Sequence, residues 1–445
     1  MEKQKSGFSS RIGFVLAAAG SAVGLGNIWR FPYLAAEYGG GIFLLVYLIL
    51  AVTFGFTMLI TEVTIGRKTG KSVIGAYTTL NKKFTPLGYI AAAVPMIIFP
   101  YYCVIGGWVL KYLTVFVTGA GSTAADGGEY FSGFIGHAAQ PSLFLSIFMA
   151  LTAIVVLLGV QKGVEKVSTI LMPVLVVMSI GIAVYVLTID GALGGLKYYL
   201  MPDFKQFSIK TVIAAMGQLF YSMSLAMGIM ITYGSYMRKE DNIEKSVRHI
   251  EIFDTAIAFL SGMMIVPAVY AISGEEAMSA GPSLMFITLP NIFEKMAGGR
   301  IIGTVFFILV LLAALTSSIS LMETIVSIIC EKFKIKRAVC CFIVLGFSFV
   351  LGLVSVFGYS IWSAVTVAGM QFLDFFDYIS NNIMMPIVAL LTCILIGFFV
   401  KTKFIESEVE LTSQFKSKKM YRIMVKFVAP LFMVVILVSS LLGVV

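Results

Sequence analysis

The sequence predicts an all-α integral membrane protein with eleven transmembrane helices, and three observations support this prediction. Of the 445 residues, 59% are hydrophobic and only 12% are charged, and the mean hydropathy is +0.97. An average soluble domain has about 25% charged residues. Apolar stretches of about 20 residues recur along the chain, and each is long enough to cross the hydrocarbon core as a helix. Lys and Arg are concentrated in every second loop between these stretches.

The apolar stretches define the predicted spans in order. They are residues 12–37, 41–66, 88–117, 142–160, 166–189, 211–237, 243–272, 301–331, 337–357, 372–400 and 421–443. No low-complexity linker separates them, so residues 1–445 are expected to form one domain. The loops 190–210 and 273–300 are long enough to hold short helices. Residues 358–371 are either a loop or the start of the tenth span.

The basic residues predict the orientation of the chain in the membrane. They lie before the first span and in the loops that follow the second, fourth, sixth, eighth and tenth spans. Loops rich in Lys and Arg stay in the cytoplasm, so we expect the N-terminus there and, after eleven spans, the C-terminus outside. This topology explains the net charge of +9 without a nucleic-acid partner.

Cysteine and histidine give no support for a membrane enzyme. The five cysteines lie in or beside apolar stretches without paired spacing, so we expect small buried residues rather than disulfides. His137 and His249 are the only histidines, and no nucleophile or metal-binding group can be built from them. An enzyme would need facing clusters of His, Cys or carboxylates, and the sequence shows none.

The first and sixth spans differ from the others because glycine and polar residues meet in their middle. Residues 20–27 contain three glycines and Asn27, and residues 217–228 contain two glycines, a glutamine and two serines. Close helix packing explains the glycines but not the polar residues beside them. Interrupted helices at corresponding positions of two halves are typical of an inverted repeat with a site at the middle of the membrane. The five-span halves would be residues 12–189 and 211–400, with 421–443 added.

Several segments resemble the neurotransmitter:sodium symporter family. One contains Gly-Leu-Gly-Asn-Ile-Trp-Arg-Phe-Pro at residues 24–32. The others follow in the family's order and are residues 62–67, 101–102, 218–225, 231–236, 281–290 and 315–318. The resemblance implies a symporter of the shorter, eleven-span bacterial type, which imports an amino acid with sodium across the inner membrane by alternating access. Its partners would be that amino acid and the lipid bilayer. A monomer is sufficient for this mechanism, and dimer formation is left open.

Two sodium sites are implied by the resemblance. Sodium is a hard cation that needs oxygen ligands, and an unwound helix supplies free carbonyls inside a protein cavity. The first site would use the carbonyl of Ala22, the side chains of Asn27, Ser222 and Asp254, and the substrate carboxylate. The second would use the carbonyls of Gly20, Val23 and Ala313 and the hydroxyls of Thr316 and Ser317. The alternative for these two hydroxyls is a hydrogen bond to carbonyls of their own helix.

The resemblance also implies a site for the amino acid. The N–H groups of Leu25 and Gly26, at the positive end of a half-helix, and the hydroxyl of Tyr102 would bind the carboxylate. The amine would meet carbonyls near Tyr221 and Ser224. The side chain would contact Ile98, Tyr221, Met227, Ser317 and Leu321, with Tyr102 and Phe220 closing over it. This apolar lining with a flexible methionine favours a hydrophobic or aromatic amino acid. A monoamine is disfavoured, because monoamine carriers have an aspartate where this chain has Gly24.

Charged residues within the spans indicate the gates, because such residues mark function in membrane proteins. By the resemblance, Arg30 and Asp374 would form the external gate. Lys5 and Glu331 would form the internal gate, with Tyr236 near them. Lysine departs from the family's usual arginine there and provides a point charge rather than a fork.

Two further spans carry family features. We expect Glu62 in the second span to hydrogen-bond the freed backbone of the broken sixth span. In the fifth span, Gly163 and Pro173 are separated by nine residues. This spacing is similar to a family element that unwinds to admit water to the inner sodium site.

The sequence predicts transport without chloride. Animal members of the family hold chloride with a tyrosine, a glutamine, two serines and an asparagine. The matching residues here are Tyr47, Gln218, Ser222, Ala258 and Asp254. Alanine has replaced one serine, and a carboxylate has replaced the asparagine. In a low dielectric, sodium ions and a zwitterion need a compensating negative charge, and Asp254 would supply it.

Other functions fit the sequence less well. A channel or scaffold with the same fold would be expected to lose sodium ligands, whereas every ligand position here has an oxygen donor. The main alternative is a proton-coupled amino-acid carrier. Such a carrier would be expected to replace sodium ligands with titratable or cationic groups, and this chain keeps both sets.

Overall fold

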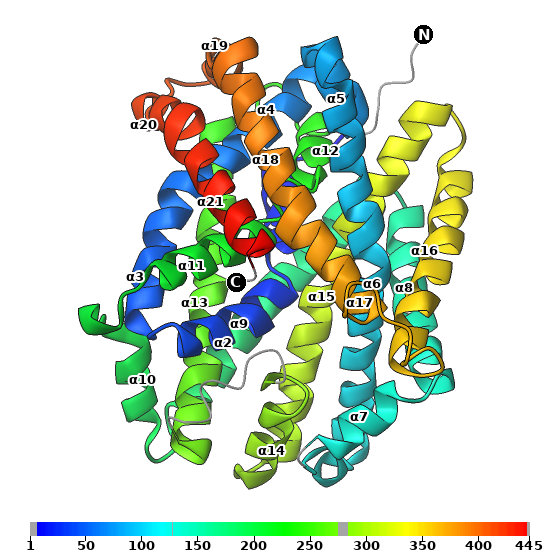
Figure 1. Cartoon of the computed structure of the whole chain (residues 1–445), viewed down its shortest axis with the longest axis vertical. Helices are drawn as coiled ribbons and strands as arrows, with labels where there is room; N and C mark the ends of the chain where they lie inside the picture. Colours follow the sequence, from blue (N-terminus) through cyan, green and yellow to red (C-terminus); the bar gives the residue numbers. More distant parts are fainter. Residues whose placement is uncertain (1–6, 127, 275–283, 443–445) are drawn as a thin grey trace.

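The computed structural model describes residues 7–126, 128–274 and 284–442, and in this part of the chain the regular elements are helices (Figure 1). The helices of the first half are α1 Arg11–Ala22, α2 Phe31–Glu37, α3 Gly41–Leu50, α4 Phe56–Thr69, α5 Val73–Leu80, α6 Thr85–Thr118, α7 Glu129–Ile135, α8 Ala139–Leu157, α9 Lys166–Val186 and α10 Ala192–Leu200. Those of the second half are α11 Ile209–Ser222, α12 Ile229–Ser235, α13 Ile243–Ser273, α14 Thr288–Lys295, α15 Gly299–Phe333, α16 Arg337–Tyr359, α17 Phe372–Asp377, α18 Met385–Ile394, α19 Lys403–Val409, α20 Lys418–Ile423 and α21 Ala429–Leu441. Short π-helical segments join several of them: Gly26–Arg30, Ala51–Gly55, Val160–Glu165, Tyr378–Met384, Leu395–Phe399 and Met424–Val428.

The helices confirm a helical membrane protein. Within the described residues, nine helices are long and apolar enough to cross a bilayer, or ten if the bent pair of α1 and the helix after it is one span. The predicted sixth span is divided between α11 and α12, which are short and are not in this count. The exact number of eleven spans and the inverted repeat therefore remain predictions.

The first predicted span is broken in its middle. α1 ends at Ala22, and the helix resumes at Gly26 with a bend of 50° between the two parts. The sequence predicted this break from the glycines of residues 20–27.

The sixth span is broken at the corresponding place. Between Ser222 and Ile229 the backbone leaves the helix, and Gly228 has φ of 72°. Two residues other than glycine, Ser224 and Ala226, also have positive φ of 52° and 59°. This conformation costs of order 1–3 kcal/mol per residue and is concentrated at functional sites.

Helix α4 supports the second break from behind. The Oε1 atom of Glu62 accepts a hydrogen bond of 2.7 Å from the backbone N–H of Ala226, which confirms the expectation for Glu62. The helices α4 and α12 are also in direct backbone contact. A Cβ atom on Gly66 would lie 1.9 Å from the Ile231 carbonyl oxygen, and one on Gly234 would lie 2.3 Å from the Val63 carbonyl oxygen. Only glycine permits this approach.

The loops follow the sequence prediction in part. The short helices α10 and α14 lie in the two loops expected to hold them. Helix α16 ends before residues 360–371 and α17 begins after them, so this segment is a loop. The short helices α5, α7 and α19 were not predicted. Gly163 lies in the π-helical segment Val160–Glu165, and Pro173 lies in α9, which follows it directly.

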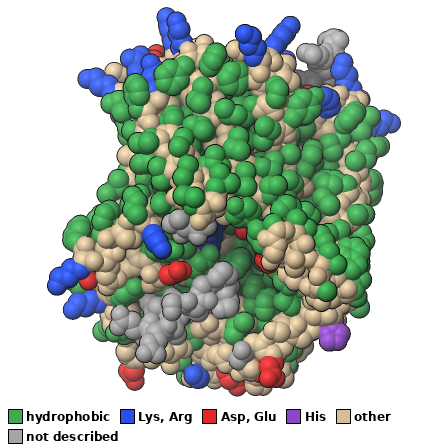
Figure 2. All heavy atoms as spheres, in the orientation of Figure 1, with side chains coloured by type: hydrophobic (Ala, Val, Ile, Leu, Met, Phe, Trp, Pro, Cys, Tyr) green, Lys and Arg blue, Asp and Glu red, His purple; other side chains and the backbone are tan. Residues whose placement is uncertain are grey.

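The surface is that expected of a protein in a bilayer. Figure 2 shows hydrophobic side chains over the middle of one face, with most of the visible Lys and Arg side chains at the end where the chain begins. Inside this apolar surface, α6 and α15 pack against each other along the centre of the molecule (Figure 1). The two broken helices meet beside them.

Candidate functional site

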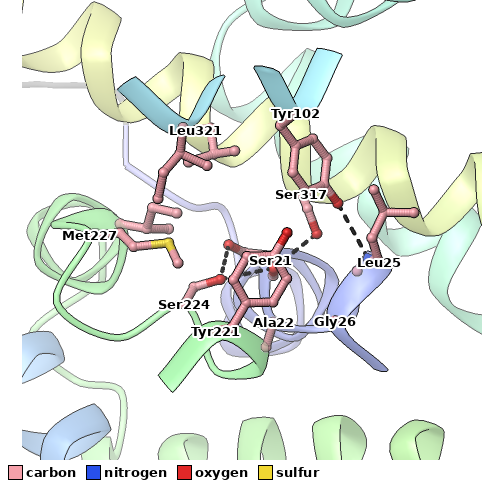
Figure 3. Close-up of a pocket in the computed structure, with 13 residues that line it drawn as sticks. Ser21, Ala22, Leu25, Gly26, Tyr102, Tyr221, Ser224, Met227, Ser317 and Leu321 are labelled. Atoms are coloured by element: carbon pink, nitrogen blue, oxygen red, sulfur yellow. Dashed lines mark hydrogen bonds between the residues drawn. The ribbon is translucent and has the colours of Figure 1, made fainter. Parts of the chain in front are cut away.

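A cavity lies where the two breaks face α6 and α15 (Figure 3). It is lined by Ser21, Ala22, Gly24, Leu25, Gly26, Ile98, Tyr102, Tyr221, Ser224, Met227, Ile229, Ser317 and Leu321. These include all the residues predicted to bind substrate except Phe220. The cavity has a volume of about 20 Å³, close to the minimum that holds one water molecule. An amino acid can therefore bind only if lining side chains move.

One end of the cavity carries hydrogen-bond donors. The backbone N–H of Leu25 donates to the Tyr102 hydroxyl over 3.3 Å, at the start of the outer half of the broken first span. A Cβ atom on Gly24 would lie 2.4 Å from the Ser317 hydroxyl oxygen. Any larger residue at position 24, an aspartate included, would displace that hydroxyl. The structure thus brings Leu25 and Tyr102 together where a carboxylate was expected.

The structure corrects the prediction that Phe220 closes over the substrate, because Phe220 does not line the cavity. Its ring packs against Phe54 with centroids 5.2 Å apart. Tyr221 lines the cavity instead, and the Arg30 guanidinium lies 5.5 Å from the Tyr221 ring centroid. Successive helical residues point about 100° apart, so a shift of one residue changes which aromatic ring closes over the site.

The structure also corrects the predicted external gate of Arg30 and Asp374. Asp374 accepts a hydrogen bond of 2.9 Å from the Tyr359 hydroxyl and is not brought to Arg30. The carboxylate that lies nearer to Arg30 is that of Asp377, one helical turn further on. Its Oδ1 also accepts hydrogen bonds from Tyr101 and from Asn381. The sequence Leu-Asp-Phe-Phe-Asp offered both aspartates, and helix phase decides between them.

Only part of the predicted internal gate lies within the residues that the structure describes. Lys5 lies outside the described residues, and the Glu331 carboxylate accepts a hydrogen bond of 2.7 Å from the Ser72 N–H. Tyr236 instead donates to Glu323 over 2.8 Å. Glu323 is fully buried and forms an ion pair with Arg337. This pair was not predicted from the sequence, although a carboxylate inside the eighth predicted span was a signal for it.

The side chains of the first predicted sodium site are in direct contact. The Asn27 amide nitrogen donates to Asp254 Oδ1 over 2.8 Å and to Ser222 Oγ over 3.1 Å. Ser222 donates to Asp254 Oδ1 over 2.6 Å, and Tyr47 donates to Oδ2 over 3.1 Å. Ala22 lines the adjoining cavity. All four side chains are buried, so a negative charge here has little access to water.

The two other residues that match the chloride ligands of animal family members lie close by. Gln218 donates to the Gly26 carbonyl over 2.7 Å. Ala258 is buried one turn after Asp254 on α13.

The second predicted sodium site lies between the end of α1 and the middle of α15. A Cβ atom on Gly20 would lie 3.3 Å from the Thr316 Cβ. The Ser317 hydroxyl donates toward the Val23 carbonyl over 3.5 Å, and the Thr316 hydroxyl donates to the Ala313 carbonyl over 3.0 Å. Thr316 thus makes the hydrogen bond within its own helix that was the alternative. A hydroxyl that donates in this way keeps its lone pairs as ligands.

The sequence matches the Sodium:neurotransmitter symporter family over residues 5–122 and 131–444. It is 35% identical to the sodium-dependent transporter YhdH of Bacillus subtilis over 415 residues, which are 92% of this chain and 90% of that one. A sodium-dependent transporter of Haemophilus influenzae is 34% identical over 456 residues, with 99% of each chain covered. The human sodium- and chloride-dependent taurine transporter is 26% identical, over 89% of this chain and 71% of its own.

The fold is also similar to a solved structure. The crystal structure of MhsT in complex with L-phenylalanine has a TM-score of 0.89 and 36% sequence identity. The match covers 98% of this chain and all of the MhsT chain.

Proposed function

The chain belongs to the sodium:neurotransmitter symporter family, and from this membership we propose that it imports a hydrophobic or aromatic amino acid together with sodium. Its relatives are sodium-dependent transporters rather than enzymes. The observation that carries the proposal is the cavity at the two helix breaks. It combines donors for a carboxylate, adjacent buried oxygen ligands and apolar walls in one place.

The walls of the cavity support the choice of substrate. Met227 and Leu321 lie on the side of the cavity away from Leu25 (Figure 3). Ile98 and Ile229 also line the cavity. An apolar side chain buried among them would be stabilised by about 25 cal/mol for each Å² removed from water. Methionine rearranges easily, so the walls can widen for a ring. The L-phenylalanine bound by MhsT supports an aromatic ligand.

We infer that sodium binds at the two predicted sites. In the first, a half-turn of the Asn27 amide would present its oxygen to a cation beside Asp254, whose carboxylate already has the required charge. The substrate carboxylate would complete that site from the cavity. In the second, the hydroxyls of Thr316 and Ser317 would keep their hydrogen bonds and supply lone pairs.

We infer further that transport does not need chloride. The carboxylate of Asp254 lies within hydrogen-bond distance of Asn27, Ser222 and Tyr47, and it would supply a negative charge beside the proposed first sodium site. The taurine transporters in the family depend on chloride by their names. A fixed carboxylate makes a bound anion redundant, because the site would otherwise carry two negative charges in a low dielectric.

The gates fit alternating access. The interaction of Arg30 with Asp377, above Tyr221, would close the outer side. The hydrogen bond of Tyr236 to Glu323 and the Glu323–Arg337 ion pair would close the inner side. We expect this cycle in the inner membrane of a bacterium, with the N-terminus in the cytoplasm.

Binding measurements on the purified protein test the proposal. Shared ligation by the substrate carboxylate means that sodium and substrate must tighten each other's binding by the same factor, with a usual range of about 5- to 150-fold. Calorimetric titration with L-phenylalanine should show this factor between sodium chloride and choline chloride. The proposal would be contradicted if sodium changed the affinity for none of the hydrophobic amino acids.

A further inference from the structure

The loop between α16 and α17, at residues 360–371, differs from the other long connections at the outer end because it carries no charge. No Asp, Glu, Lys, Arg or His occurs from residue 338 to residue 373. The connections at residues 119–138, 187–208 and 274–298 each contain acidic residues together with lysine or histidine. We call residues 360–371 the uncharged loop.

Three large apolar side chains of the uncharged loop are exposed. The exposed fraction is 65% for Ile361, 40% for Trp362 and 52% for Val365. Apolar surface of this kind is destabilised when water surrounds it. In the part of the chain that the structure describes, the indole N–H of Trp362 has no hydrogen-bond partner. A side chain with an apolar ring and one free donor is suited to a boundary between an apolar and a polar medium.

The uncharged loop has a defined fold that presents these side chains outward. The backbone N–H of Trp362 donates to the Phe357 carbonyl over 2.8 Å. The Trp362 ring packs against Phe357 and Phe372, with centroids 5.2 Å and 6.2 Å apart. Val367 and Met370 exchange two backbone hydrogen bonds of 2.9 Å and 3.0 Å. The exposed apolar surface is therefore part of an ordered structure.

The uncharged loop continues a surface that faces the bilayer. Helix α16 exposes large apolar side chains, with exposed fractions between 37% and 65%, at Val339, Phe342, Ile343, Phe349 and Val350. Figure 1 shows the loop at the side of the molecule, at the end of α16 away from the N-terminus. The short helices α7 and α14 extend further in that direction (Figure 1). The loop thus lies at the outer edge of the bilayer-facing surface and not at the outermost tip of the protein.

We propose that the uncharged loop is inserted in the interfacial layer of the outer leaflet, where Ile361 and Val365 contact acyl chains and the Trp362 indole N–H donates to a phospholipid ester oxygen. Tryptophan is enriched at this depth in membrane proteins. Lipid is favoured over a second copy of the chain, because specific protein interfaces have a polar rim and residues 338–373 offer no charged group for one. The inference goes beyond transport and does not depend on which substrate is carried.

The insertion has a consequence for the outer gate. Directly after the uncharged loop, Asp374 in the first turn of α17 accepts a hydrogen bond of 2.9 Å from the Tyr359 hydroxyl at the end of α16. This bond closes the base of the loop. The lipid anchor therefore holds the start of α17, which also carries Asp377.

Tryptophan fluorescence of the full chain in proteoliposomes tests the proposal. The chain has three tryptophans, Trp29, Trp108 and Trp362. Trp362→Phe keeps an aromatic ring, so the difference in emission between the unmodified protein and this variant belongs to Trp362. Phospholipids brominated on the acyl chain close to the glycerol should remove most of this difference. Iodide on both sides of the membrane should leave most of it.

A label on the uncharged loop provides an independent measurement. Ile361→Cys would carry a thiol-reactive fluorophore, and labelling of the unmodified protein gives the background from its five cysteines. Ser132→Cys is the matched control, because Ser132 is exposed on α7, which extends further outward. We expect brominated lipid to quench the label at residue 361 and iodide to quench the label at residue 132.

Two results would overturn the inference. Quenching of both Trp362 and the label at residue 361 by iodide, without quenching by brominated lipid, would place the loop in water. Quenching by neither agent, together with cross-linking of two Ile361→Cys chains in the bilayer, would make this surface an interface between copies.

Discussion

Replacing Asp254 by asparagine removes the negative charge proposed to stand in for chloride while keeping the size of the side chain. Asp254 is fully buried and accepts hydrogen bonds from Asn27, Ser222 and Tyr47. The neutral amide keeps one oxygen that can still accept from these neighbours. The substitution therefore tests the charge rather than the packing.

The size of the effect follows from the burial of this charge. Two unit charges about 4 Å apart attract each other by about 4 kcal/mol at an effective dielectric constant of about 20. Desolvation of the carboxylate offsets part of this attraction. Since about 1.4 kcal/mol corresponds to a factor of ten, we expect Asp254→Asn to weaken sodium binding by about 10- to 100-fold.

The assay is a sodium titration of L-phenylalanine uptake in proteoliposomes, with ionic strength held constant by choline. Asp374→Asn is the matched control, because its carboxylate bonds Tyr359 at the outer surface and should leave the sodium half-saturation unchanged. Adding Ala258→Ser to Asp254→Asn restores one more chloride ligand, so uptake by the double variant should rise with chloride. A sodium half-saturation within twofold of the unmodified protein in Asp254→Asn would refute the reasoning.

Three other predictions concern the gate and the helix breaks. Asp377→Asn should slow uptake by about tenfold or more through loss of a charge interaction between two half-buried side chains, whereas Asp374→Asn should not; equal effects in the same uptake assay would argue against the corrected gate. Glu62→Gln should keep an acceptor for the Ala226 N–H and remain stable, while Glu62→Ala should cost about 1–3 kcal/mol of unfolding free energy, measured as a lower melting temperature in detergent. Gly234→Ala should destabilise by more than about 1–3 kcal/mol, because its Cβ would meet backbone rather than a movable side chain; a melting temperature equal to that of the unmodified protein would contradict the close contact.

The fold and most of the cavity could be predicted because their signals are local. Glycine and polar residues within residues 20–27 and 217–228 mark the two breaks whatever the rest of the chain does. Oxygen-bearing side chains beside those breaks then indicate the ligands. Of the residues predicted to bind substrate, only Phe220 lies away from the cavity.

The remaining features depend on helix phase and tertiary packing. The aromatic residue over the site was predicted as Phe220 and is Tyr221, one residue later. The acidic gate residue was predicted as Asp374 and is Asp377, one turn later. Approximate helix boundaries do not determine which face of a helix meets the site. The Glu323–Arg337 pair joins two helices, and its geometry depends on how α15 packs against α16. Tyr236 and Glu323 are 87 residues apart, so no local pattern could connect them.

The central claim is that sodium drives accumulation of an amino acid, and one measurement tests it directly. Proteoliposomes loaded with potassium gluconate would take up labelled L-phenylalanine from external sodium gluconate or choline gluconate at equal pH on both sides. The account predicts uptake above the external concentration in sodium gluconate, without chloride, and only background uptake in choline. Equal accumulation in choline, or accumulation that appears only when an inward proton gradient is imposed, would contradict it.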